Sequence, residues 1–186
     1  GINVEKPTVD VPAMLDRKNK IISQLTTGIG GLFKHNGVVV LQGRGKVLSG
    51  ARVEVTNGKG NPSIVDAGSV IIAAGSVPIT IPPAPINGDT IVDSTGALEF
   101  DSIPKRLGVI GAGVIGLELG SVWKRVGSEV VLLEALDTFL PMMDSQVASE
   151  SAKIFKKQGL DIRMGARVTN AVEKKNKVSL NYQSSG

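Results

Sequence analysis

The sequence predicts an α/β protein in which a parallel sheet, followed by a β-meander, is preceded by a domain made of one helix and an antiparallel β-meander. Three observations support this fold class. Strands and helices alternate from residue 106 to residue 164, a long helical stripe and short strands fill the first 75 residues, and a connector rich in proline and glycine separates the two parts. We therefore expect one domain over residues 1–100 and a second over residues 101–186.

The first part of the chain is predicted to contain one helix and several strands. Asp10 is a candidate N-cap and Gly37 a candidate end of a helix whose apolar positions recur from Val11 to Phe33. His35 is interpreted as a residue at its C-terminal end and not as a catalytic group. Strands are expected at Val38–Gln42, Ala51–Thr56 and Ser63–Val65, with a turn at Asn57–Gly58, and a strand buried on both faces is expected at Ser69–Ala73.

The second part predicts a β-α-β-α-β unit followed by a hairpin. This alternation favours a parallel sheet with helices on both faces. A helical turn is expected within Ser94–Phe100. The later elements are expected at Arg106–Ile110 (strand), Val114–Val126 (helix), Glu129–Glu134 (strand), Ser145–Gln158 (helix), Asp161–Met164 (strand), and Arg167–Glu173 with Lys177–Tyr182 (hairpin).

Composition excludes several classes of function. The chain has no cysteine and one histidine, so it can form neither a disulfide nor a thiolate or polyhistidine metal site, and we expect no metal. Its 21 Lys and Arg barely exceed its 17 Asp and Glu, and 3% of residues are aromatic, so we expect no nucleic-acid partner. The most cationic segment, residues 173–177, is interpreted as a solvated turn.

No run of 18 apolar residues occurs, and four prolines interrupt the most apolar stretch, residues 69–86. We therefore expect neither a membrane span nor a signal peptide. The expected location is the cytoplasm, with the mitochondrial matrix as the alternative.

The most informative pattern is a G-x-G-x-x-G string that begins at Gly111. The string alone is weak evidence, but an apolar strand precedes it, a helix follows it, and a second strand ends in Glu134, 23 residues after Gly111. Gly111 permits a tight turn, Gly113 lets the backbone approach a pyrophosphate, and Gly116 lets the helix pack closely on the strand. Free N–H groups and the helix dipole then favour an anion. The pattern predicts a dinucleotide site; the alternative is a glycine-rich crossover that binds no ligand.

Glu134 is predicted to favour NAD over NADP. Its carboxylate can accept hydrogen bonds from ribose hydroxyls and would repel a 2′-phosphate, at roughly 4 kcal/mol per charge pair for a separation of ~4 Å and an effective dielectric near 20. The next three residues offer no cation that could bind such a phosphate. The alternative for Glu134 is an ordinary surface acid after a strand.

Two further features have more than one interpretation. Glu118 has no lysine at i+4, where Val122 stands, so it is either a functional carboxylate near the ring end of the cofactor or a solvent-facing glutamate. The segment Phe139–Met143 is interpreted as packing and not as a cofactor-binding segment.

The segment from Gly111 to Ser128 resembles the dihydrolipoyl dehydrogenases, flavoproteins of the pyridine nucleotide–disulfide oxidoreductase family. Ile91–Leu98 and Gly30–Lys34 resemble upstream segments of the same family, so the resemblance covers essentially the whole chain. It implies a Rossmann-like NAD-binding domain and the oxidation of dihydrolipoamide, with electrons passing through a disulfide and FAD to NAD⁺. The alternatives are a soluble transhydrogenase or mercuric reductase, and a non-catalytic nucleotide-binding module.

The resemblance also implies the residues of two cofactor sites. Glu118 would lie near the nicotinamide and flavin and is the one candidate for a catalytic role in this chain. At the FAD site, Ala74 replaces the family's usual threonine, so a hydroxyl contact is lost there. NAD would be bound by Gly111, Ala112, Gly113, Val114, Ile115, Gly116, Leu117, Glu118, Glu134 and Val168, and FAD would be contacted by Gly45, Ala74, Gly75 and Ser76.

The family's N-terminal flavin motif, redox cysteine pair, later flavin motif and C-terminal His-Glu base are not among these 186 residues. The resemblance therefore implies a central fragment with no lipoamide turnover of its own. In it, residues 1–100 would form a partial FAD-binding domain and residues 101–186 an NAD-binding domain that is incomplete at its C-terminus. The resemblance implies that the parent is a homodimer that acts on the dihydrolipoamide domain of a 2-oxoacid dehydrogenase complex.

Overall fold

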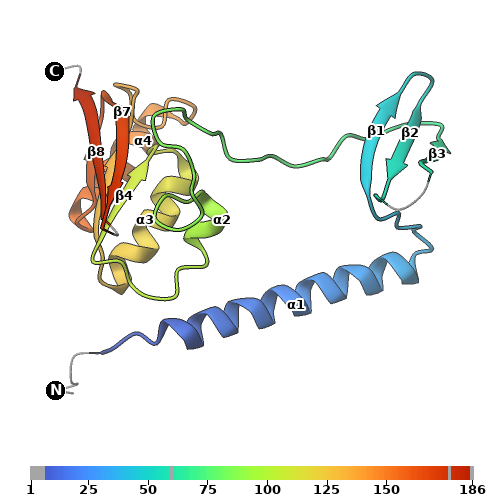
Figure 1. Ribbon diagram of the computed structural model, residues 1–186, viewed down its shortest axis with the longest axis horizontal. Helices are drawn as coiled ribbons and strands as arrows, with labels where there is room; N and C mark the ends of the chain where they lie inside the picture. Colours follow the sequence, from blue (N-terminus) through green and yellow to red (C-terminus); the bar gives the residue numbers. More distant parts are fainter. Residues whose placement is uncertain (1–6, 59–60, 176, 185–186) are drawn as a thin grey trace. The chain divides into compact units, whose positions relative to one another are not determined.

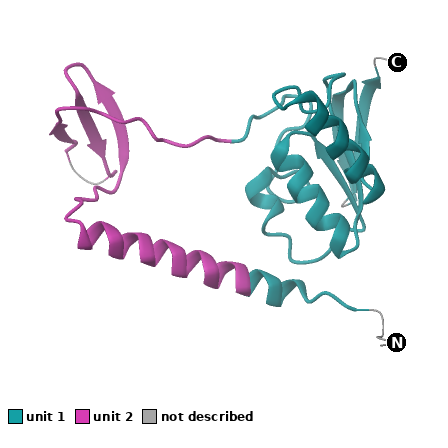
Figure 2. Cartoon of the chain, turned by 180° about the vertical axis from the view of Figure 1, so that it is seen from behind, with its two compact units in different colours: residues 1–16, 78–186 teal, residues 17–77 magenta. Residues whose placement is uncertain are grey.

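The computed structural model describes residues 7–58, 61–175 and 177–184, and the chain divides into two compact units (Figures 1 and 2). The first unit takes in residues 1–16 and 78–186, and the second takes in residues 17–77. The domain boundary expected after residue 100 stays a prediction for the whole protein.

Helix α1 (Val11–His35) begins and ends at the predicted residues. The Asp10 carboxylate accepts a hydrogen bond from the N–H of Ala13 at 2.9 Å, and Gly37 turns the chain with φ of 67°. Although α1 has 25 residues, neither it nor any other helix in the described ranges is long and apolar enough to cross a membrane.

The second unit contains an antiparallel sheet in the order β1-β2-β3. The prediction of a strand at Val38–Gln42 is wrong, because these residues form no strand. The nearest strand, β1, begins two residues later, at Arg44. A strand needs a hydrogen-bonding neighbour as well as β-branched residues, and the residues in register with β2 are those of β1. The Asn57–Gly58 turn runs into residues 59–60, which lie outside the described residues. The strands are β1 (Arg44–Leu48), β2 (Arg52–Thr56) and β3 (Ser63–Asp66).

The prediction of a doubly buried strand at Ser69–Ala73 is also wrong. These residues form no strand, and Ile71 and Ile72 are 91% and 76% exposed. A strand buried on both faces must pair on both sides, and in the described part of the chain no strand pairs with this segment.

The first unit contains the predicted parallel sheet, in the order β4-β5-β6. Asp93 caps the short helix α2 by accepting a hydrogen bond from the N–H of Gly96 at 2.9 Å. The elements agree with the sequence analysis to within one or two residues. They are α2 (Ser94–Ala97), β4 (Arg106–Ile110), α3 (Val114–Val126), β5 (Glu129–Leu133), α4 (Ser145–Lys157), β6 (Asp161–Arg163), β7 (Ala166–Lys174) and β8 (Lys177–Ser184).

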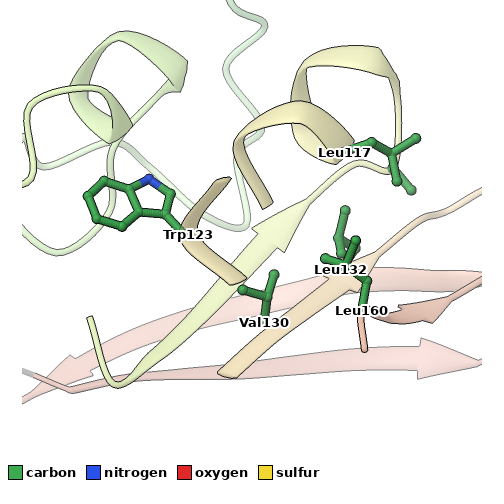
Figure 3. Packing of buried hydrophobic residues seen from close by; sticks show 6 residues of the cluster. Leu117, Trp123, Val130, Leu132 and Leu160 are labelled. Carbon is green, nitrogen blue, oxygen red and sulfur yellow. The ribbon is translucent and has the colours of Figure 1, made fainter. Parts of the chain in front are cut away.

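Strand β5 lies between the two layers of the core. Val130 and Leu132 belong to a cluster that contains Leu117 and Trp123 of α3 (Figure 3), and Phe155 of α4 packs against that same cluster. The alternate residues of β5 pack with the β7–β8 hairpin on the other face. The expectation that helices cover both faces is therefore wrong, because two right-handed crossovers that advance in one direction place both helices on one face.

Candidate functional site

The glycine-rich turn joins β4 to α3. Gly111 has a φ of 100°, in the region that favours glycine, and its N–H donates to the carbonyl oxygen of Leu133 at 2.8 Å. A Cβ on Gly116 would collide with the carbonyl oxygen of Gly111. The turn therefore has the tight bend and the close helix packing that the glycine spacing predicted.

The first turn of α3 is open to a ligand. Gly113 is the N-cap, with φ of −73° and ψ of 179°, and it has no side chain to bond the first N–H groups of the helix. A Cβ built on Gly113 would meet no atom within 4 Å. Free N–H groups and the positive end of the helix dipole therefore face open space, which suits an anion.

Glu134, directly after β5, is fixed beside this turn. Its Oε2 accepts from the N–H of Ala112 at 2.8 Å, and its Oε1 accepts from the N–H of Leu136 at 3.0 Å. Its own N–H donates to the carbonyl oxygen of Arg163 at 2.9 Å. An ionised carboxylate offers about four acceptor positions, so oxygen lone pairs are left for hydroxyl groups of a ligand.

A pocket of about 270 Å³ lies where the turn and Glu134 meet. Some of its lining residues, such as Gly113 and Glu134, were predicted from the sequence. The lining residues between Leu136 and Met143 were not. Phe139 packs against the core as interpreted, but the residues that follow it line the pocket. Their place in the loop that follows β5 and Glu134 was a usable signal, because ligands bind at the carboxyl ends of parallel strands. The lining residues are Ala112, Gly113, Val114, Glu134, Leu136, Thr138, Leu140, Pro141, Met142 and Met143.

The other residues proposed for NAD lie away from this pocket lining. Glu118 is exposed on α3, Leu117 is buried in the core, and Val168 is buried beside Leu133 in the cluster under the hairpin. The structure brings Glu134 and the first glycines together, and the roles of Glu118 and Val168 stay predictions.

A second pocket, of about 330 Å³, lies within the second unit. Gly45 and Ala74 both line it, although 28 residues separate them along the chain. The remaining lining is apolar and includes Val47, Val53 and Ile71. Gly75, with φ of 72°, and Ser76 follow directly but do not line the pocket.

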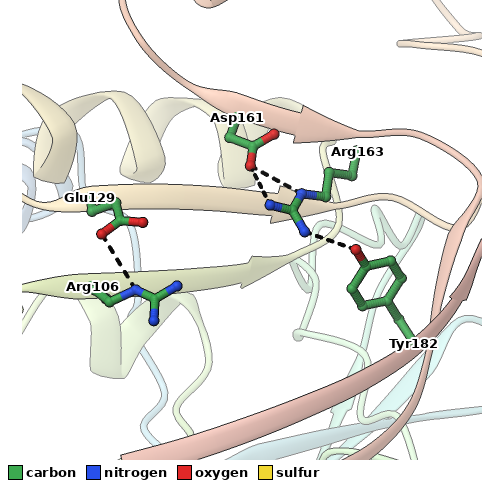
Figure 4. Close-up of polar contacts among 5 residues, drawn as sticks. All are labelled: Arg106, Glu129, Asp161, Arg163 and Tyr182. Atoms are coloured by element: carbon green, nitrogen blue, oxygen red, sulfur yellow. Dashed lines mark hydrogen bonds and ion pairs between the residues drawn. The ribbon is translucent and has the colours of Figure 1, made fainter.

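Exposed polar contacts connect the strands next to the site (Figure 4). Arg163 of β6 donates to Asp161 at 2.6 and 3.0 Å and to the hydroxyl of Tyr182 on β8 at 2.8 Å. The Asp161 bond, and then the Tyr182 bond, raise the pKa of Arg163 above its ordinary value, so the guanidinium stays charged. Because the Arg163 carbonyl also bonds Glu134, these contacts help to hold the acid in place.

The family model of the pyridine nucleotide-disulphide oxidoreductases matches residues 3–185. Among curated proteins, a dihydrolipoyl dehydrogenase of Cupriavidus necator is 45% identical over 98% of this chain and 38% of its own length. A mitochondrial dihydrolipoyl dehydrogenase of Pisum sativum is 41% identical over 90% of this chain and 34% of its own length. The chain thus spans little more than a third of the length of these relatives.

Two solved structures share the fold. LpdA from Mycobacterium tuberculosis aligns with a TM-score of 0.83 at 24% identity, over 95% of this chain and 40% of that chain. The HOCl-induced flavoprotein disulfide reductase RclA from Escherichia coli aligns with a TM-score of 0.74 at 27% identity, over 91% and 38%.

Proposed function

The chain belongs to the pyridine nucleotide-disulphide oxidoreductase family, and from that premise we propose that it supplies the NAD site of a dihydrolipoyl dehydrogenase. One observation carries this proposal. The uncapped start of α3 and the carboxylate of Glu134 line a single pocket at the carboxyl end of the parallel sheet.

The pyrophosphate of NAD would lie against the N–H groups that follow Gly113, and Glu134 would accept hydrogen bonds from the adenosine ribose hydroxyls. None of the described residues that line this pocket is a Lys or Arg, so among them a 2′-phosphate would meet the Glu134 carboxylate with no cation beside it. NAD is therefore the proposed dinucleotide. The remaining NAD contacts, at Ile115, Gly116, Leu117, Glu118 and Val168, are part of the same proposal.

Gly45, Ala74, Gly75 and Ser76 would contact FAD. The shared pocket of Gly45 and Ala74 supports this assignment, because a glycine and a small apolar residue leave space for a flat ligand. The two cofactors supply the redox chemistry, and the residues of this chain bind and orient them. Glu118 stays the candidate for a functional carboxylate near their rings.

The whole protein would oxidise dihydrolipoamide and reduce NAD⁺, as a homodimer acting on the dihydrolipoamide domain of a 2-oxoacid dehydrogenase complex. Its proposed location is the bacterial cytoplasm or the mitochondrial matrix. Because these 186 residues include no cysteine, dithiol chemistry cannot take place on them. We therefore expect no reduction of NAD⁺ by dihydrolipoamide with this chain alone; turnover would refute that expectation.

Calorimetric titration of the chain with NADH and NADPH tests the nucleotide site. We expect saturable NADH binding, weaker NADPH binding, and an NADH affinity about tenfold lower in Glu134→Ala, because a hydrogen bond to a charged group contributes about 1.5–3 kcal/mol. The matched control is Glu150→Ala, which removes an exposed glutamate of α4 that pairs with Lys153. Unchanged affinity in Glu134→Ala would remove Glu134 from the site, and absence of NADH binding would refute the proposal.

A further inference from the structure

Two of the four methionines lie together at the pocket. Met142 is 96% exposed and Met143 is 45% exposed, and both line the pocket beside Glu134. The other two, Met14 and Met164, are only partly exposed, and Met14 packs against the hydrophobic core. Solvent therefore reaches the thioether of Met142 far more easily than those of Met14 and Met164.

A tight turn places the backbone of Met142 and Met143 beside the pocket. Leu140 has a φ of 45°, and its carbonyl oxygen accepts a hydrogen bond from the N–H of Met143 at 3.0 Å. Pro141 follows Leu140 in this turn, and its ring fixes its own φ. The position of Met142 at the mouth of the pocket thus follows from the backbone of residues 140–143.

We propose that Met142 and Met143 form an oxidation-sensitive site at which hydrogen peroxide weakens dinucleotide binding. This inference rests on the proposed function, because the affected ligand is the dinucleotide in the same pocket. The sulfur lone pair attacks one peroxide oxygen and the O–O bond breaks, and the departing hydroxide takes the proton of the transferred oxygen, which leaves an S=O bond and water. The sulfur loses two electrons and the peroxide is reduced to water, so the step needs no other reactant.

Oxidation of Met142 to the sulfoxide would make an apolar wall of the pocket more polar. The wall that follows Glu134 is built mainly from apolar side chains, among them Leu136, Leu140 and Pro141. A sulfoxide oxygen on Met142 is a strong acceptor, and of the described residues that line the pocket, Thr138 is the only one with a donor side chain. A dinucleotide that covers the oxidised residue would have to remove water from this oxygen, which opposes binding.

Peroxide treatment of the full chain, followed by peptide mass spectrometry and NADH titration, tests the inference. We expect the sulfoxide to form on Met142 first, at least about tenfold faster than on Met14 and Met164. The NADH dissociation constant should then rise about fivefold or more, and methionine sulfoxide reductases should restore it.

The control is the double variant Met142→Leu with Met143→Leu, compared before and after treatment. Its NADH affinity, whatever its starting value, should not change with peroxide, whereas Met14→Leu should stay as sensitive as the unaltered chain. Equal oxidation of all four methionines, or the same loss of affinity in the double variant, would overturn the inference. Untreated chain that fails to bind NADH would instead refute the proposed function; binding that survives complete oxidation of Met142 would refute only the oxidation site.

Discussion

Gly116 sets how closely α3 packs against β4, because a Cβ at this position would overlap the carbonyl oxygen of Gly111. We expect Gly116→Ala to lower the free energy of unfolding by about 1–3 kcal/mol, the usual cost of forcing extra atoms into a packed site. Urea denaturation followed by the fluorescence of Trp123, the single tryptophan, measures this change.

Gly113→Ala is the matched control for that variant. A Cβ at Gly113 would meet no atom within 4 Å and its φ is −73°, so the free energy of unfolding should change by less than about 1 kcal/mol. The added methyl group would, however, lie where the pyrophosphate approaches, and NADH affinity should fall. Equal destabilisation by the two substitutions would contradict these separate assignments for the two glycines.

Residues at the site differ in how well the sequence could predict them. Gly116 and Glu134 could be identified because their requirements are local: a turn out of a strand, and the end of the next strand. Leu136 and Met142 were missed: their place in the loop after Glu134 is a general signal for ligand binding, but which residues of that loop line the pocket depends on how the chain folds back. One contact that fixes the path of this loop is the hydrogen bond from the N–H of Gly165 to the carbonyl oxygen of Leu136, at 2.9 Å.

Among the elements, α2 is attached to α3 by one buried aromatic residue. The indole N–H of Trp123 donates to the carbonyl oxygen of Ala97 at 3.1 Å, and its ring lies 5.4 Å from that of Phe100. We expect Trp123→Phe to cost about 1–3 kcal/mol, because it leaves the Ala97 carbonyl without this donor and removes buried apolar surface. Thermal unfolding followed by circular dichroism measures the loss; a transition equal to that of the unaltered chain would show that the contact contributes no stability.

Helices and paired strands were predictable, and unpaired extended segments were not. The cap at Asp10 and the glycine-rich turn at Gly111 are local signals, and the structure confirms them. The residues of Val38–Gln42 and Ser69–Ala73 are equally apolar, but pairing partners decide whether such segments become strands. Pattern alone also could not show that a hairpin, and not a helix, covers the second face of the parallel sheet.

At the scale of the whole molecule, the exposed apolar stripe of α1 is the feature that we expect to promote association. Leu25 and Leu32 are 63% and 62% exposed, and Ile22 is 49% exposed. An exposed apolar stripe of this kind promotes association, so we expect the average mass of the chain to rise with concentration in analytical ultracentrifugation. The double variant Leu25→Gln with Leu32→Gln should reduce this rise, whereas Ser23→Gln, on the same helix, should not. A single monomeric mass at every concentration would contradict the prediction.

A crystal structure of the chain with NADH would show both ends of the proposed dinucleotide site in one measurement. We expect the pyrophosphate to lie against the N–H groups that follow Gly113, and the adenosine ribose to donate hydrogen bonds to Glu134. A nucleotide bound elsewhere, or a Glu134 carboxylate that makes no contact with the ribose, would contradict this expectation.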